Sequence, residues 1–460
     1  MTTLRIARRA ADRLHAGHLW VYRTDLETKQ DSEPTPGALV TLTSAGKPLG
    51  TAIYSTASQI AARLISPTPD LTRQQYLDDL RQRIAAALQL RHELAPVTAA
   101  NNAHRLLFSE ADNLPGVLAD RYNDLVLLQL LTQSTAQDDV RAAIVAALRE
   151  GLDTGPLTIW ERPDPRIREL EQLPPPPPGP LFTSFESCHL DRSPTAPSLG
   201  EVERSASPPQ LHNPPTTTTF TLNNLRFTYD AAAGQKTGAF LDQRLNYAAA
   251  TSHVQTSGRT ARALDICTYQ GGFALHLAQV CDRVTGVDSS RAALEAADQN
   301  LTLNPHLKAT TDWIEADAFD YLRHLDTTRS SVISTGGGAF AAAAERPASL
   351  SSHSSNLYDA IVLDPPAFAK SKRAADAALR GYKELNLRAL RLLTPGGTLI
   401  TNSCSHHVSL EDFTAIVASA AADAGRRVQL LETRAAAPDH PELLTLPETR
   451  YLKCLICRVD

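Results

Sequence analysis

The stretch from Ala263 to Phe273 combines an apolar run, a carboxylate at Asp265 and two adjacent glycines, and a second apolar run ends at Asp288 and Ser289. This pattern is typical of a buried strand, a turn that opens a helix, and a second strand that ends in a carboxylate. Such an edge of an α/β sheet holds adenosine-type cofactors. The turn lacks the G-x-G-x-x-G fingerprint that admits a pyrophosphate. The spacing therefore favours S-adenosylmethionine over a dinucleotide, although a strand and helix joined by purely structural glycines would show the same pattern.

Two further segments add reactive groups at the same predicted edge. An apolar strand, Ala360–Leu363, is followed by Asp364 and two prolines, whose rings fix φ and stiffen the loop. A second strand, around residues 399–401, is followed by Cys404 among small polar residues. Most cysteines are inert small hydrophobes, but this position predicts that Cys404 faces the same cleft as Asp364 and acts as a nucleophile.

A thiol and a carboxyl beside a methyl donor suit methylation of a pyrimidine at C5. C5 is a poor nucleophile, and addition of a cysteine to C6 makes it reactive by dividing one difficult step into easier ones. Asp364 would hydrogen-bond the N3/N4 edge of a cytosine. The base that removes the C5 proton is left open between His406, His407 and a water. Since a free thiol is only slightly ionised at neutral pH, we expect the site to lower the pKa of Cys404.

The composition of the chain indicates in which cellular compartment this chemistry is expected. The chain has 460 residues, of which 42% are hydrophobic, and no apolar run reaches the roughly 20 residues of a membrane span. The N-terminal residues have arginines but no apolar central region, so we expect no secretory signal. Six scattered cysteines favour free thiols in a reducing cytoplasm. Cys454 and Cys457 form a C-x-x-C pair inside an apparent strand, where we expect no metal.

The net charge of −5 is not that of a typical nucleic-acid binder, but the first segment is locally basic. Its arginines and histidines could contact phosphates or simply form a solvated charged face. These side chains are Arg5, Arg8, Arg9, Arg13, His15, His18 and Arg23.

The first part of the chain reads as two small domains. Residues 1–70 carry short β-type runs between Gly and Pro turns, which favours a β-barrel-like module. Residues 71–173 combine strand patterns with helical periodicity over Leu71–Leu94 and Asp138–Leu148, which favours a central α+β domain. The Pro-, Ser- and Thr-rich residues 174–219 are expected to be a disordered linker.

Residues 220–460 are expected to form a single α/β domain. After a hairpin over residues 220–229 and a helix beginning near Leu241, strands and helices alternate, which predicts a doubly wound sheet. A low-complexity insertion near 327–356 interrupts it and is expected to be disordered. The predicted strands are Ala263–Ile266, Val284–Val287, Asp312–Glu315, Ala360–Leu363, Thr398–Thr401, Val428–Glu432 and Leu452–Cys457.

Taken together, these segments resemble the bacterial 23S ribosomal RNA cytosine-C5 methyltransferases, class I S-adenosylmethionine-dependent enzymes with an N-terminal PUA domain. The resemblance covers most of the chain, and many motifs occur in the same order. They are His18–Tyr22, Ser109–Gly116, Asp120–Tyr122, Lys236–Arg244, Tyr269–Phe273, Asp364–Pro366, Arg380–Asn386, Ser403–Ser405 and Asp439–Pro441. The two low-complexity insertions depart from the family pattern.

The resemblance implies a PUA-like module, a small central α+β domain and a Rossmann-like methyltransferase domain. It implies that Cys404 is the nucleophile and that Asp364 lies by the target base. For the cofactor, it implies that Asp288 holds the ribose. Asp317 and Ala318 are expected at the adenine, and the methionine end is expected beside Asp265, Tyr269 and Gly271, with Arg244 close by. The expected cofactor-binding set is completed by Gly272, Phe273, Ser289 and Asp364.

The function expected from these observations is transfer of a methyl group from S-adenosylmethionine to cytosine C5 in 23S ribosomal RNA, either naked or in a large-subunit assembly particle. The first alternative is methylation of an exocyclic amine such as guanine N2, which needs no covalent thiol. The second is a non-catalytic RNA-binding protein that keeps the fold. No membrane partner is expected, and a homodimer is left open.

Overall fold

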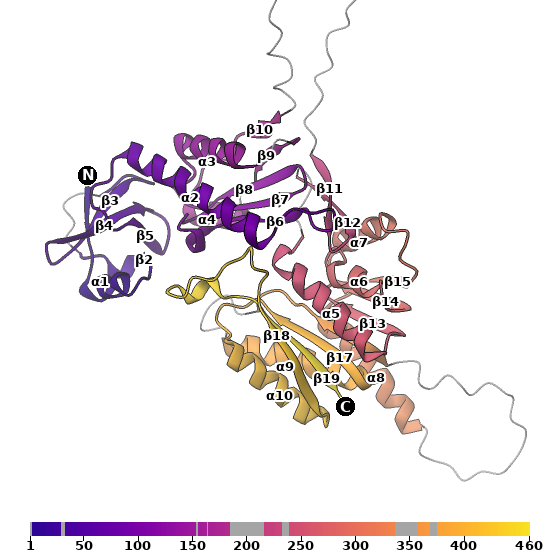
Figure 1. Cartoon of the computed structure of the whole chain (residues 1–460). Coiled ribbons are helices and arrows are strands. Elements are labelled where there is room, and N and C mark those ends of the chain that lie inside the picture. The colour runs from indigo at the N-terminus through magenta and orange to yellow at the C-terminus, as the bar shows by residue number, and fades with distance from the viewer. Residues whose placement is uncertain are drawn as a thin grey trace, which may run out of the picture. The chain divides into compact units, whose positions relative to one another are not determined.

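The computed structural model describes residues 2–28, 33–152, 155–162, 164–184, 216–231, 239–335, 357–368 and 375–460. The chain divides into two units, which are described separately below (Figure 1). The first comprises Met1–Phe220, Tyr229–Gly238 and Leu443–Leu446, and the second comprises Thr221–Thr228, Ala239–Glu442 and Pro447–Asp460. Most of the predicted linker and insertion, residues 185–215 and 336–356, lies outside the described residues.

The first sheet of unit 1 confirms the β-type runs expected in residues 1–70. It has five strands in the order β1-β3-β4-β5-β2. Alternate residues of its strands face opposite sides: Ala52 and Tyr54 join the core of this sheet, while Ile53 packs with the helix that follows. The elements are β1 (Thr2–Arg5), α1 (Arg8–His15), β2 (Trp20–Tyr22), η1 (Arg23–Asp25), β3 (Leu39–Ser44), β4 (Lys47–Tyr54) and β5 (Ile60–Ser66).

The second sheet of unit 1 has the order β10-β9-β8-β7-β6. Helix α2 begins after Thr72, whose side chain forms a capping box with Gln75. Strand β10 lies inside the stretch expected to be a linker, and this corrects that boundary, since Phe182 and Thr183 pair with β9. The elements are α2 (Arg73–Leu94), β6 (Ala103–Phe108), η2 (Ser109–Asp112), β7 (Val117–Tyr122), β8 (Leu125–Leu130), α3 (Asp138–Gly151), β9 (Thr158–Glu161), α4 (Pro165–Glu171) and β10 (Phe182–Thr183).

The second unit contains a seven-stranded sheet in the order β15-β14-β13-β16-β17-β19-β18. Strands β13 to β17 are parallel to one another, and β19 runs antiparallel to both β17 and β18. The predicted alternation of strands and helices is therefore confirmed. Within the described ranges, no helix combines the length and apolar character that crossing a membrane requires.

The hairpin and the helices of this region agree with the sequence except at the insertion, where α8 continues to Thr335, past the predicted start of the insertion at Thr327. The hairpin is β11 (Thr217–Leu222) with β12 (Leu225–Asp230). The strands are β13 (Arg262–Ile266), β14 (Arg283–Asp288), β15 (Thr310–Glu315), β16 (Tyr358–Leu363), β17 (Leu393–Ser403), β18 (Val428–Arg434) and β19 (Lys453–Val459). The helices are η4 (Leu241–Gln243), α5 (Arg244–Ser257), α6 (Gly272–Leu277), α7 (Arg291–Thr302), α8 (Ala318–Thr335), α9 (Ala375–Leu392), α10 (Leu410–Ala424) and η6 (Pro447–Thr449).

The central strand β16 is buried at every position, and apolar from Ala360 to Leu363, because both faces of the sheet are covered. Ala360 and Val362 belong to a core with α5 and α6, whereas Ile361 and Leu363 belong to a core with α9 and α10. A doubly wound sheet of this kind binds ligands at the carboxyl ends of its strands, where the strand order reverses. In this sheet that point lies between β13 and β16.

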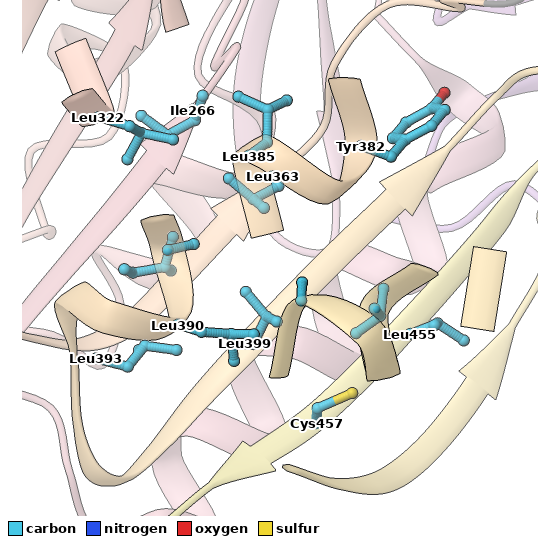
Figure 2. Packing of buried hydrophobic residues seen from close by; sticks show 14 of the residues in the cluster. Ile266, Leu322, Leu363, Tyr382, Leu385, Leu390, Leu393, Leu399, Leu455 and Cys457 are labelled. Atoms are coloured by element: carbon cyan, nitrogen blue, oxygen red, sulfur yellow. The ribbon is translucent and has the colours of Figure 1, made fainter. Parts of the chain in front are cut away.

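The second of these cores holds α9 against the sheet. Figure 2 shows Leu385 and Leu390 of α9 together with Leu363, Leu399 and Leu455 from three strands. All five side chains are almost completely excluded from solvent. The helix that follows the Asp364 loop is thereby held against the strands whose ends carry the predicted reactive groups.

Truncation of Leu385 to Ala should lower the free energy of unfolding by about 2–5 kcal/mol, because it removes buried methyl groups and leaves a cavity. The control is Leu431→Ala, since Leu431 is 49% exposed on β18, and it should change stability by less than about 0.5 kcal/mol. Urea denaturation followed by circular dichroism measures both. Equal effects of the two substitutions would contradict this packing.

Candidate active site

The carboxyl ends of β13 and β16 form one continuous edge. Ile266 and Leu363 are register partners, and the Asp364 amide donates to the Ile266 carbonyl at 3.2 Å. Beyond β13 the chain turns sharply, with positive φ at Cys267 (64°) and Tyr269 (51°). Left-handed backbone at residues other than glycine costs roughly 1–3 kcal/mol each and is concentrated at ligand sites. The strain is therefore located where the sequence predicts the cofactor turn.

Two glycines are needed for this turn to reach the helix. Gly271 has a φ of 85°, which glycine adopts without steric cost. At Gly272 an added Cβ would lie 2.6 Å from the hydroxyl oxygen of Tyr247. Close packing of α5 against the start of α6 therefore excludes any side chain at Gly272.

Asp265 has one satisfied and one unsatisfied carboxylate oxygen. Its Oδ2 accepts hydrogen bonds from the Thr268 hydroxyl at 2.6 Å and the Ala274 amide at 2.9 Å. Its Oδ1 is buried and has no hydrogen-bond partner among the described residues. Burial raises the pKa of Asp265 to about 7. An uncompensated carboxylate oxygen of this kind is poised to accept a hydrogen bond from a cationic ligand group.

A narrow cavity opens beside this oxygen, and all of its walls come from unit 2. Gln270 is one of its wall residues, and the Nε2 atom of Gln270 is also buried and unpartnered among the described residues. One free acceptor and one free donor fit the amino and carboxylate groups of an amino acid, and hence the methionine end of S-adenosylmethionine. The lining residues are Leu222, Phe227, Ala239, Phe240, Tyr247, Asp265, Cys267, Thr268, Tyr269, Gln270, Gly272, Phe273 and Asp364.

Sequence reasoning missed several of these wall residues. Leu222 and Phe227 come from the β11–β12 hairpin. Tyr247 comes from α5, and its ring packs edge-on against that of Phe273. Nothing in a single sequence indicates that a buried tyrosine of one helix packs against a glycine at the start of another. The hairpin was predicted, but its contribution to a cavity wall could not be.

The carboxylates expected at the ribose and adenine lie at successive strand ends but do not line the cavity. Asp288 ends β14, and its two oxygens accept from the Tyr269 and Ser290 amides at 3.0 and 2.9 Å. This holds the strained turn against the neighbouring strand. Asp317 is exposed and accepts from the amides of Phe319 and Asp320 at the start of α8. Contacts of Asp288, Ser289, Asp317 and Ala318 with a cofactor stay predictions.

Arg244, expected close to the methionine end, is not one of the lining residues. It begins α5, is 5% exposed, and its guanidinium lies 3.0 Å from the buried carboxylate of Asp439. A buried ion pair that loses one partner leaves an uncompensated charge. The motif residues around 244 and 439 are therefore held together by charge pairing.

Asp364 lies at the end of β16 and is held by a chain of amides that the sequence did not reveal. Gln243 Nε2 donates to both of its carboxyl oxygens, at 3.1 and 3.2 Å. The Asn246 side-chain amide donates to Oε1 of Gln243 at 2.6 Å, and Nε of Arg434 donates to Oδ1 of Asn246 at 2.9 Å. Each link fixes the orientation of the next amide. Burial, followed by the charges of Asp265 and Asp242, raises the pKa of Asp364 well above its ordinary value.

Cys404 follows β17 directly and is partly buried, with its Sγ 3.8 Å from the Pro365 carbonyl oxygen. The structure thus brings Cys404 to the loop of Asp364. Cys404 is not one of the cavity-lining residues, so its expected position in the same cleft as Asp364 stays a prediction. The expected lowering of its pKa is wrong. Burial and the charges of Asp364 and Asp242 raise the pKa of this thiol to about 12, so the resting side chain is protonated.

The remaining candidates are less informative. His406 and His407 lie in the loop after Cys404 and are exposed overall. The ring centroid of His406 lies 5.5 Å from that of Tyr451, and partial desolvation of the imidazole lowers its pKa. Cys454 and Cys457 are buried in β19. In the described ranges, no group of three or more His, Cys, Asp and Glu side chains is arranged to hold a metal ion. Cys188 lies outside the described residues.

Binding of S-adenosylmethionine should weaken at acidic pH, because a cationic amino group prefers an ionised Asp265 and that carboxyl has a pKa of about 7. Between pH 8 and pH 6 the ionised fraction falls about tenfold, and Kd should rise by about the same factor. Isothermal titration across this range measures the effect. Asp265→Asn should bind more weakly and lose this acidic dependence; an unchanged pH profile in the variant would contradict the assignment.

Comparison with solved structures supports the fold. A putative S-adenosylmethionine-dependent methyltransferase from Streptococcus mutans superposes with a TM-score of 0.72, covering 100% of both chains at 19% sequence identity. A putative methyltransferase crystallised with S-adenosylhomocysteine gives the same values. The predicted Rossmann-like class I methyltransferase fold is thus confirmed.

Comparison with sequences identifies the family. Residues 4–67 match the model of a PUA-like domain. The ribosomal RNA large subunit methyltransferase I of Erwinia tasmaniensis is 33% identical over 444 residues, covering 96% of this chain and 95% of that protein. The protein of the same name from Citrobacter koseri is 31% identical over 443 residues, covering 96% and 95%. With a full-length match of this extent, the chain belongs to the ribosomal RNA large subunit methyltransferase I family.

Proposed function

We propose that this protein transfers a methyl group from S-adenosylmethionine to C5 of a cytosine in 23S ribosomal RNA, through a covalent bond between Cys404 and C6. Its relatives carry the name of large-subunit ribosomal RNA methyltransferases. The choice of cytosine as the target nucleobase rests on the contact of the Cys404 thiol with the loop of Asp364. A nucleophilic sulfur and a carboxyl group at adjacent strand ends suit a pyrimidine whose C6 and N3 must be addressed together.

The cofactor supplies an electrophilic methyl group carried on a sulfonium. Asp265 and Gln270, which both line the cavity, would hold its amino-acid end through their unpartnered Oδ1 and Nε2 atoms. Phe240 and Tyr269, whose ring centroids are 5.1 Å apart, would exclude water from the same end. Asp364 lines this cavity, and the thiol contacts the carbonyl oxygen of the next residue, Pro365, so the Asp364 carboxyl would lie between cofactor and nucleophile.

The covalent sequence conserves electrons and protons. The Cys404 sulfur, having lost its proton, donates an electron pair to C6, and the C5–C6 π pair makes C5 nucleophilic. C5 would then take the methyl group as the bond between the methyl carbon and the sulfonium sulfur breaks, which leaves S-adenosylhomocysteine. Loss of the C5 proton to a base would return electrons to the C5–C6 bond, and the Cys404–C6 bond would break to release the thiolate, which regains a proton. The net products would be methylated cytosine, S-adenosylhomocysteine and one proton.

A raised pKa of Asp364 favours cytosine over guanine, because it makes the protonated carboxyl more accessible when a base binds. A protonated Asp364 would donate a hydrogen bond, and N3 of cytosine is an acceptor. Donation to N3 withdraws electrons from the ring and makes C6 more electrophilic. The N1–H and N2–H₂ groups of guanine are donors and would instead require an ionised carboxylate.

The exocyclic-amine alternative has a further weakness in the aromatic residue after the prolines. Such enzymes use an aromatic side chain directly after the prolines, and this chain has Ala367 there. The next residue, Phe368, packs against Phe319 and Tyr382, with centroid distances of 5.8 and 4.8 Å. Phe368 is therefore engaged in the hydrophobic core of α8 and α9 and is poorly placed to clamp a base.

Contact with RNA is assigned to the PUA-like domain, but several of its basic side chains are already paired. Arg9 and Arg13 bind the buried carboxylate of Asp25 at 2.9 and 2.6 Å, and Arg23 donates to the carbonyls of Ser55 and Ser58. Arg8 remains exposed. Phosphate contacts at this surface are therefore expected to depend on fewer charges than the sequence indicates.

Replacement of Cys404 by Ala should abolish methyl transfer, at least about 10³-fold, while the affinity for S-adenosylmethionine is retained, because the thiol supplies the nucleophile and does not line the cofactor cavity. Transfer of a radiolabelled methyl group to 23S RNA measures activity, and wild-type enzyme should form a denaturation-resistant complex with 5-fluorocytosine RNA. Cys281→Ala, at a buried cysteine outside the site, is the control. Methylation by the Cys404 variant would exclude the thiol mechanism.

A further inference from the structure

The buried cations of the described chain show one exception to charge pairing. Each buried arginine has a carboxylate within 3.5 Å: Glu110 for Arg63, Asp112 for Arg91, Glu161 for Arg141 and Asp439 for Arg244. Lys453 is 4% exposed and has no carboxylate partner among the described residues. A buried ammonium without a counter-ion is costly, so an anion that forms nearby during the reaction would stabilise it.

The position of Lys453 identifies that anion. Lys453 begins β19 and lies opposite Ser403 in the register of β17 and β19. Its Nζ donates to the carbonyls of Ser405 and Val408, at 2.7 and 2.8 Å. These contacts use two of the three N–H groups of an ammonium. The charge is thus held beneath the loop that begins at Cys404.

We propose that Lys453 is a positioning residue that holds the Cys404 loop in place and provides the positive charge against which the Cys404 thiolate forms. The inference rests on the proposed covalent role of Cys404. Sequence reasoning gave no such role to Lys453, because a lysine inside an apolar strand carries no catalytic signature.

The charges around the thiol act in opposite directions. Asp364 and Asp242 disfavour the thiolate, and Lys453 favours it. His406 and His407 lie in the same loop with exposed rings. Burial lowers the pKa of Lys453 to about 8, while the neighbouring Cys404 acts to raise it. Since each charge stabilises the other, ionisation of the thiol and retention of the ammonium are coupled.

The test measures the reactivity of Cys404 without RNA. The rate of iodoacetamide alkylation of the Cys404 peptide is followed by mass spectrometry against pH in wild type, Lys453→Met and Lys453→Arg, with the cofactor absent. Lys453→Met should raise the apparent pKa of the thiol by about one unit or more, which slows alkylation about tenfold at a given pH below it. Lys453→Arg keeps the charge and should stay within about half a unit of wild type.

The matched control is Lys383→Met, which removes a half-exposed lysine paired with Asp423 in the same unit and should leave the alkylation profile unchanged. In methylation assays Lys453→Met should lower kcat with little change in KM for RNA. A folded Lys453→Met protein with the wild-type alkylation profile would overturn the proposal. If Lys453→Met does not fold, a thiol pKa in Lys453→Arg raised by one unit or more would overturn it as well.

The outcomes also separate this proposal from the proposed function. Methylation by the Cys404→Ala variant would refute the covalent mechanism whatever the alkylation profiles show. Loss of methylation in Cys404→Ala together with unchanged alkylation in Lys453→Met would refute the role of Lys453 alone.

Discussion

Parallel backbone pairing of β16 with β13 on one side and β17 on the other is the constraint on which the site depends. Because parallel strands end at the same edge, residues almost 140 positions apart, from Asp265 to Cys404, come together at one edge of the sheet. The carboxylate side of the cavity, the Asp364 loop and the thiol all follow from that pairing. The helices contribute by covering both faces of the sheet, so that these strand ends are set in a dry and rigid frame.

Most of the fold could be predicted from the sequence because its strands and helices are marked by period and by turn residues. Most strands from β13 to β19 are close to their predicted bounds, since most are apolar runs ended by polar or glycine residues, but β17 (Leu393–Ser403) begins well before the predicted Thr398. Two further differences lie in segments that were predicted to be disordered from their composition alone. Phe182 and Thr183 form an edge strand despite their proline-rich surroundings, because backbone pairing with β9 needs only two residues. Helix α8 likewise extends into a serine-rich stretch.

Some residues of the site could be predicted from the sequence and others could not, and the difference has a physical cause. Side chains that follow directly from a strand end, such as Asp364 and Cys404, could be placed because the sheet determines their position. Side chains on helices and hairpins could not, since their contribution depends on packing angles. The hydrogen bonds from Arg434 through Asn246 and Gln243 to Asp364 join residues up to 188 positions apart in the sequence. The pKa of Cys404 also escaped prediction, because burial and two nearby carboxylates outweigh the single ammonium.

The protonated state of Cys404 has a consequence for the survival of the enzyme. Peroxides and other oxidants attack thiolates far faster than thiols, and a sulfinic or sulfonic product cannot be reduced back by ordinary cellular thiols. A raised pKa keeps the proposed nucleophile mostly in the neutral, oxidation-resistant form at neutral pH. Suppressed ionisation in the resting protein would thus also protect a residue whose proposed role requires it to remain intact through many turnovers.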